Sequence, residues 1–138
     1  MTLERFVEAQ DPVYETALAE LRRGDKRSHW MWFVFPQLAG LGRSPTAQRF
    51  GLGGREEATE YLAHPVLGAR LRACSQVLLG LDTHDPEDVL GVTDALKLRS
   101  SMTLFAAVSD DLVFRLVLER YYAGEPDPVT LELLQPSL

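Results

Sequence analysis

The residues best suited to chemistry begin in one short segment, where cationic, imidazole and aromatic side chains follow one another. This segment, residues 26–37, supplies six candidate side chains: Lys26, Ser28, His29, Trp30, Trp32 and Gln37. An imidazole that titrates near neutral pH can act as a general acid or base, or can bind an anion. Aromatic faces can stack on a planar group such as a nucleobase. The alternative is that both tryptophans belong to the core and that His29 forms a hydrogen bond at its edge.

A second group of candidates lies in a helix predicted over residues 92–107. At about 100° per residue, Asp94, Lys97 and Ser101 fall within about 60° of one another, beside the apolar face. A phosphate or carboxylate ligand could use lysine as a point charge and serines as donors. An ordinary Asp94–Lys97 pair at i,i+3, worth a few tenths of a kcal/mol, is the alternative. The candidates for ligand binding in this helix are Lys97, Arg99, Ser100 and Ser101.

A glycine-containing stretch, residues 38–54, separates these two groups in the chain. It is predicted to be a loop with at most one short helix near residues 45–49, and long loops inside compact domains are often functional. Its segment 40–44 could present backbone N–H groups and Arg43 to an anion. The segment lacks the Lys-Ser/Thr pair of a Walker loop and the third glycine of a dinucleotide fingerprint. The other interpretation is a turn in which Ser44 caps the short helix.

Together these residues predict a pocket for a small anionic ligand, such as a nucleotide, an ADP-ribose-like molecule or a phosphorylated metabolite. If the chain is an enzyme, His29 is the candidate acid or base, Asp94 is its orienting partner, and hydrolysis or group transfer suits these residue types. The alternative is a non-catalytic module that senses a ligand or binds a protein. We expect no metal site, because the three histidines do not have the spacing of metal ligands, and no cofactor.

Charge and composition narrow the classes of partner. The 138 residues carry a net charge of −6, which argues against a general nucleic-acid binder. The segment 22–55 nevertheless holds seven of the fourteen basic residues and one acidic residue, Asp25. The chain has one cysteine, Cys74, and no apolar run near the roughly 20 residues that span a bilayer. We therefore expect a cytoplasmic protein without membrane contact, and the oligomeric state stays open.

Capping residues predict a compact all-α single domain over residues 1–138, with about seven or eight short helices and one long glycine-containing loop. In three Asp-Pro pairs, at 11–12, 85–86 and 127–128, the aspartate suits an N-cap and the proline the first helical position. Glycines 24, 80 and 124 follow periodic segments as C-terminal caps do. The apolar block 28–37 is either a buried helix ending near Val34 or a buried strand. Helices are predicted at 3–9, 12–23, 56–63, 65–79, 86–90, 92–107, 110–122 and 128–134.

Several of these motifs resemble one known family. Residues 26–37 and 40–44 closely resemble the signature of a bacterial and fungal family catalogued as domain of unknown function 1810, and residues 57–65 and 94–105, with Gly124 and Asp127, resemble it as well. The resemblance covers almost the whole chain and implies a mainly helical single domain, but it implies no established activity.

This chain departs from the family pattern at two positions. Phe50 stands where the family commonly has tyrosine. Ala95 stands where it commonly has a second acidic residue, which argues against a paired-acid role for Asp94. Some members carry a calpastatin label, but calpain inhibition by disordered repeats does not suit a compact domain with two tryptophans.

Overall fold

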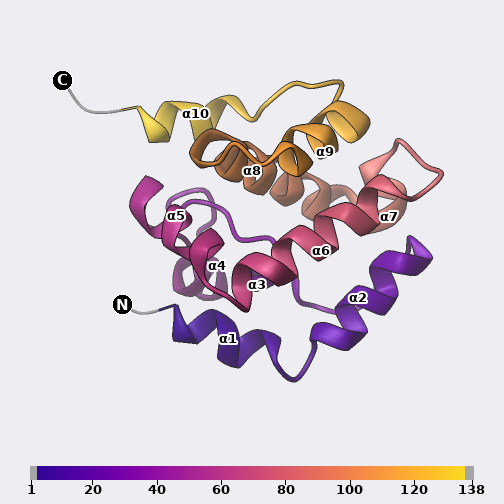
Figure 1. The fold of residues 1–138 in the computed structure, drawn as a ribbon, viewed down its shortest axis with the longest axis horizontal. Coiled ribbons are helices and arrows are strands. Elements are labelled where there is room, and N and C mark those ends of the chain that lie inside the picture. Colours follow the sequence, from indigo (N-terminus) through magenta and orange to yellow (C-terminus); the bar gives the residue numbers. More distant parts are fainter. Residues whose placement is uncertain (1–2, 136–138) are drawn as a thin grey trace.

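The computed structural model describes residues 3–135, and these residues form helices joined by loops (Figure 1). The all-α prediction is confirmed. The aromatic block forms one helical turn, and the glycine-containing loop holds a second short helix. With these two, residues 3–135 contain ten helices. They are α1 (Glu4–Gln10), α2 (Tyr14–Arg23), α3 (Met31–Val34), α4 (Pro45–Phe50), α5 (Arg55–Ala63), α6 (Leu67–Leu79), α7 (Pro86–Leu90), α8 (Val92–Val108), α9 (Leu112–Tyr122) and α10 (Pro128–Leu134).

Helix α8 is the central element of the fold. Helices α3, α5, α7, α9 and α10 all pack against it. In Figure 1, α8, α9 and α10 occupy the upper half, α1 and α2 lie along the lower edge, and α6 runs between them. From Leu98 to Phe105 every residue except Arg99 is buried. The sequence predicted one apolar face on this helix, but packing on several sides also buries its hydroxyl-bearing residues.

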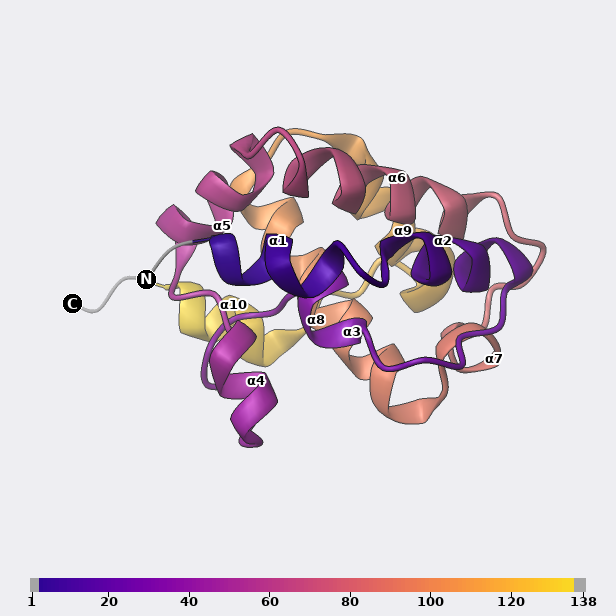
Figure 2. The same cartoon turned by 90° about the horizontal axis from the view of Figure 1, so that it is seen from below.

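Aromatic rings link the helices through the core. The ring of Phe6 on α1 meets Tyr61 on α5 edge-on, with centroids 5.1 Å apart. Tyr61 lies 5.5 Å from Phe105 on α8, and Phe105 lies 5.7 Å from Phe114 on α9. Such pairs contribute about 0.5–1.5 kcal/mol each beyond the area they bury. Figure 2, seen from below, shows α1 and α2 in front of this core. Within residues 3–135, no helix has both the length and the apolar character that crossing a bilayer requires.

Two of the three predicted Asp-Pro caps are present. Asp85 accepts the backbone N–H of Glu87 at the start of α7, and Asp127 caps α10 in the same way. The prediction for Asp11 was wrong. Helix α1 continues until the N–H of Asp11 bonds to the carbonyl of Val7, so Pro12 falls in a turn and α2 begins only at Tyr14.

The glycine-containing loop is closed at its base by backbone hydrogen bonds. The N–H of Ala39 donates to the carbonyl of Leu52, and the N–H of Leu52 donates to the carbonyl of Gln37. Gly51 is required at this closure, because a Cβ there would lie 2.7 Å from the Cα of Ala39. Within the loop, the Ser44 hydroxyl accepts the N–H of Ala47 at 3.1 Å and begins α4. The interpretation of residues 40–44 as a turn before a capped helix is therefore confirmed.

Candidate functional site

A buried carboxylate fixes the segment that enters the aromatic block. Glu20 on α2 is 3% exposed, and it accepts hydrogen bonds from the backbone N–H groups of Arg27 and Ser28, the Ser28 hydroxyl and the indole N–H of Trp30. Burial is the largest influence and alone would raise the pKa of Glu20, but the hydrogen bonds together lower that pKa to about 2. Residues 27–30 are thus held against α2.

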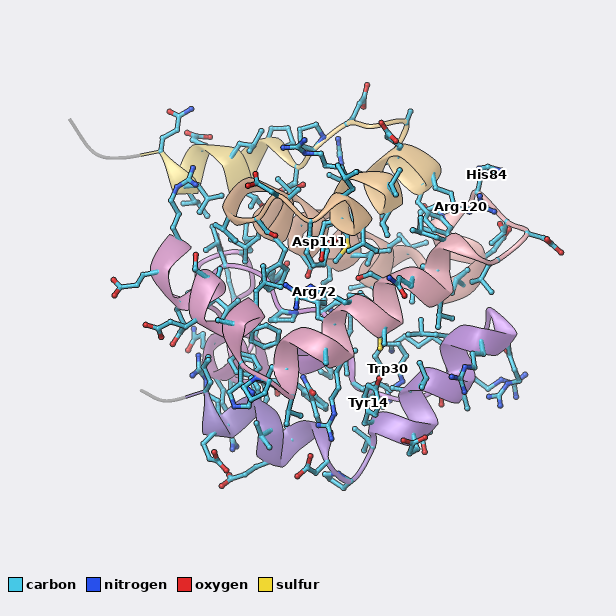
Figure 3. The ribbon with its side chains drawn as sticks, viewed as in Figure 1. Tyr14, Trp30, Arg72, His84, Asp111 and Arg120 are labelled. Atoms are coloured by element: carbon cyan, nitrogen blue, oxygen red, sulfur yellow. The ribbon has the colours of Figure 1, made fainter. Side chains whose placement is uncertain are left out.

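The position of Trp30 corrects one expectation from the sequence. Its side chain has no exposed surface, and Figure 3 shows it beside α2, where its indole donates to Glu20 at 2.9 Å. Trp30 therefore cannot stack on a ligand at the surface. Ser28 is also engaged by Glu20 rather than free to donate to a ligand. No local pattern in the sequence predicts these contacts, because Glu20 belongs to another helix, ten positions before Trp30.

Asp94 stands between two lysines in the first turn of α8. Its Oδ2 lies 2.7 Å from the Nζ of Lys26, and its Oδ1 lies 3.2 Å from the Nζ of Lys97. Lys26 reaches this position because its backbone N–H donates to the carbonyl of Val89 on α7. We call these three side chains the lysine–aspartate cluster; it carries one more positive than negative charge. The sequence offers two partners for Asp94, His29 and Lys97; the structure pairs Asp94 with Lys97 and, in addition, with Lys26.

Trp32 is the tryptophan that remains accessible. The Nζ of Lys97 lies 5.3 Å from the centroid of the Trp32 ring, within cation–π range. The imidazole of His29, an exposed residue, has its centroid 6.5 Å from the same indole. The indole of Trp32 is therefore near both His29 and Lys97. Lys26 approaches the buried Trp30 in a similar way, at 5.0 Å.

A surface hollow of about 390 Å³ adjoins the lysine–aspartate cluster. The loop after α3, one side of α8 and the first turn of α10 form its walls. We call it the Lys97 hollow. Three of its lining residues, Gln37, Lys97 and Ser100, are candidates from two separate parts of the sequence. Arg43 is exposed and follows directly after Gly42 in the lining loop.

Several polar groups of the Lys97 hollow keep unused hydrogen-bonding capacity. Within residues 3–135, the side chains of Gln37 and Thr93 form no hydrogen bond. The ammonium group of Lys97 has three N–H donors, and within the same residues it donates one hydrogen bond, to Asp94. Ser100 differs, because its hydroxyl already donates to the carbonyl of Leu96 at 3.2 Å. A ligand could therefore bind to Lys97, Gln37 and Thr93 without breaking bonds that stabilise the fold.

The remaining candidates on α8, Arg99 and Ser101, do not line the Lys97 hollow. Arg99 donates to the carbonyls of Glu125 and Pro126, both at 3.0 Å, and so holds the segment before α10. Ser101 is fully buried, and its hydroxyl has no hydrogen-bond partner in the part of the chain that the structure describes.

Asp127 lines the Lys97 hollow, although its Asp-Pro pair predicts a helix cap rather than a ligand contact. Its backbone N–H donates to the Thr103 hydroxyl at 2.8 Å, which fixes it against α8. Thr93 also lines the hollow and was likewise missed. For Asp127 a signal was available, because this residue belongs to the motifs that resemble the known family.

A larger hollow, of about 620 Å³, lies beside the start of α5. Its arginines are already engaged. Arg5 pairs with Glu57 at 3.3 Å, and Arg55 donates to the carbonyls of Leu134 and Ala107. Glu56 and Glu60 add further negative charge to the lining. This hollow holds none of the candidates from the sequence, and the Lys97 hollow is the better site for an anion.

Metal binding and cysteine chemistry are two further possibilities, and the described residues provide little for either. Among residues 3–135, no group of three or more His, Cys, Asp or Glu side chains is placed to hold a metal ion. Cys74 is buried, and this burial raises the pKa of its thiol to about 12. A thiolate nucleophile at neutral pH is therefore not expected from Cys74.

Comparisons with known proteins identify the family. The chain is similar to a crystal structure of the conserved hypothetical protein Rv1873 from Mycobacterium tuberculosis, with 49% sequence identity, a TM-score of 0.96, and coverage of 98% of this chain and 97% of that one. No curated protein matches the chain. The sequence profile described as protein of unknown function DUF1810 matches residues 1–134. The chain therefore belongs to the DUF1810 family, as its motifs predicted.

Proposed function

We propose that this protein binds a small anionic ligand, such as a phosphorylated metabolite, in the Lys97 hollow. The observation that carries the proposal is the position of Lys97, which lines the hollow while belonging to a cluster with an excess of positive charge. An ammonium group is a compact point charge with rotatable donors, and it suits a phosphate oxygen. Gln37 and Thr93 supply further polar groups from two different walls.

The surroundings of the hollow support an anion rather than a cation. Lys97 is 19% exposed, so it keeps access to solvent while Asp94 holds it in place. Lys26 is only 7% exposed and does not line the hollow itself. A partly desolvated cation interacts with an anion more strongly than a fully exposed one does. Arg43, which is exposed beside the loop that lines the hollow, adds a further positive charge close to it.

The geometry supports ligand binding more directly than catalysis. A hydrolase or transferase using His29 would need a group to orient the imidazole, and Asp94 is already held by Lys26 and Lys97. His29 is exposed and is not among the residues that line the Lys97 hollow. A ligand-sensing module is therefore the simpler form of the proposal. Any catalysis would depend on His29, and His29→Ala would then abolish turnover of a bound ligand while leaving its affinity unchanged.

The test is a binding titration of the wild-type protein with inorganic phosphate, ribose 5-phosphate and adenosine 5′-monophosphate. At a hundred times its dissociation constant, a ligand adds about 2.7 kcal/mol to stability. In a domain of this size, that increment raises the unfolding midpoint by several degrees. We expect Lys97→Met to weaken binding by about tenfold or more, the equivalent of about 1.4 kcal/mol.

The matched control is Arg27→Gln, which removes a nearby positive charge. The Arg27 side chain is 76% exposed and pairs with Asp25. The variant Arg27→Gln should leave the affinity for phosphorylated ligands unchanged within about twofold, because an exposed charge pair contributes little. Two results would overturn the proposal. One is a flat response of folded wild-type protein to every phosphorylated compound, and the other is equal affinity in Lys97→Met.

A further inference from the structure

We infer that the ligand of the Lys97 hollow is a ribose-containing phosphate, such as a nucleotide, whose hydroxyl groups bind to Asp127. This inference rests on the proposed function and names its ligand class. Lys97 on α8 and Asp127 before α10 line the same hollow with opposite charges. A ligand that satisfies both needs an anionic group for the lysine and hydrogen-bond donors for the carboxylate.

One oxygen of the Asp127 carboxylate remains able to accept a hydrogen bond from a ligand. As the cap of α10, it accepts the N–H of Thr130 at 2.9 Å and the hydroxyl of Thr130 at 2.6 Å. Within residues 3–135, both of these bonds reach Oδ2 and none reaches Oδ1. A carboxylate oxygen only accepts hydrogen bonds. The charge of a bare phosphate would be repelled by this carboxylate, whereas a neutral sugar hydroxyl would donate a hydrogen bond to it.

Asp127 is also held rigidly enough to select a ligand. Its backbone N–H donates to Thr103, and the hydroxyl of Thr103 donates in turn to the carbonyl of Arg99. Arg99 fixes the two residues before Asp127 through their carbonyls. A polar group that is preorganised in this way loses little conformational entropy when a ligand binds.

Aliphatic side chains around the hollow fit the apolar parts of a nucleoside. Leu96 and Val129 line it and are 64% and 50% exposed, and Leu41 lines it from the loop. Exposed aliphatic groups beside convergent polar groups are typical of a small-molecule site. The hollow, at about 390 Å³, falls within the range of about 300–1,000 Å³ for such sites. The face of a sugar or base would cover these side chains.

The test compares adenosine 5′-monophosphate with its 2′-deoxy counterpart by isothermal titration calorimetry. We expect the wild-type protein to bind the ribonucleotide about tenfold more tightly than the deoxynucleotide, because the latter lacks one donor for Asp127. In Asp127→Asn, this preference should fall below about threefold. Inorganic phosphate should bind more tightly to the same variant, because the repelling charge is removed.

Asparagine is itself a good N-cap, so Asp127→Asn should keep α10 in place. The matched control is Asp85→Asn, which changes the cap of the other Asp-Pro helix, α7, away from the hollow. It should leave both nucleotide affinities unchanged. The comparison of the two nucleotides on wild-type protein needs no variant, so the inference stays testable if Asp127→Asn does not fold.

The possible outcomes separate this inference from the proposed function. Equal affinities for the two nucleotides, with binding still dependent on Lys97, would overturn the inference and leave the proposed function standing. Absence of binding by any phosphorylated compound to folded wild-type protein would overturn both. A ribonucleotide preference that persists in Asp127→Asn would show that another group recognises the hydroxyls, and would also overturn the inference.

Discussion

Glu20 and Asp94 both bind the segment that carries Lys26, Trp30 and their neighbours, but they use their oxygens in different ways. Glu20 is 3% exposed and accepts four hydrogen bonds from neutral donors within residues 27–30. Asp94, with a side chain 18% exposed, pairs with two ammonium groups, one of which lines a surface hollow. The comparison indicates that a carboxylate bound by neutral donors fixes the fold. In the proposed function, a carboxylate outnumbered by cations positions charge for a ligand.

The largest effect should come from Glu20→Ala. Removing this carboxylate leaves the buried indole N–H of Trp30 and the half-buried hydroxyl of Ser28 without their acceptor. We expect the free energy of unfolding to fall by about 3–5 kcal/mol, as measured by urea denaturation. Glu15→Ala, at an exposed position on the same helix, should change it by less than about 0.5 kcal/mol.

The two indoles give an internal check on this prediction. In the milder variant Glu20→Gln, the ¹H–¹⁵N resonance of the Trp30 indole should shift, because its acceptor changes from a carboxylate to an amide. The resonance of the Trp32 indole should stay in place, because Trp32 contacts Lys97 and His29 instead. A small loss of stability in Glu20→Ala, together with an unchanged Trp30 resonance in Glu20→Gln, would remove the distinction between the two carboxylates.

The contribution of Glu20 should also depend on pH. The pKa of Glu20 is lowered from its usual 4.5 to about 2, so between these values the unfolded chain binds a proton that the folded protein does not. Stability from this group is therefore fully present above about pH 5 and is lost as the pH falls toward 2. Urea denaturation at pH 7, 5 and 3 should show the gap between wild type and Glu20→Gln narrowing as the pH falls.

Comparison with Glu20→Gln isolates this residue from other acids. The pKa of Asp111 is also lowered, because hydrogen bonds from Arg72 and Val113 outweigh its burial, and Figure 3 shows Arg72 and Asp111 side by side. That contribution is the same in both proteins and cancels in the difference. A gap that stays constant down to pH 3 would mean that the charge of Glu20 does not hold residues 27–30.

Much of the fold could be predicted from the sequence, because capping is a local property. Asp85 and Asp127 cap helices through the N–H groups of the next few residues. Proline at the first helical position needs no hydrogen bond of its own. Asp11 shows the limit of this reasoning. The same Asp-Pro pair can end the preceding helix as well as begin the next, and only the hydrogen bond to Val7 decides between the two.

The site was harder to predict because it depends on contacts between distant residues. Helical periodicity correctly placed Asp94 beside Lys97, three positions along the chain. It could not show that Lys26 also reaches Asp94, because that contact depends on the path of the chain past α7. The same limit hid the burial of Trp30, whose acceptor Glu20 lies ten positions away on another helix.

The smallest effect on stability should come from Asp94→Asn, and this variant tests the other half of the comparison. It leaves Lys26 and Lys97 facing each other without the carboxylate that separates them. We expect a loss of about 1–2 kcal/mol in unfolding free energy, because Lys26 still donates to the carbonyl of Ser28 and Lys97 keeps contact with solvent. Phosphate should restore part of this loss and bind about threefold more tightly or better at low salt, since an anion can take the place of the carboxylate.

The control is Asp25→Asn, which breaks the exposed pair with Arg27 and should alter neither the unfolding free energy nor the affinity for phosphate. If Asp94→Asn lost as much stability as Glu20→Ala and gained no affinity for phosphate, Asp94 would be a second structural anchor, and the excess charge of its cluster would not serve a ligand.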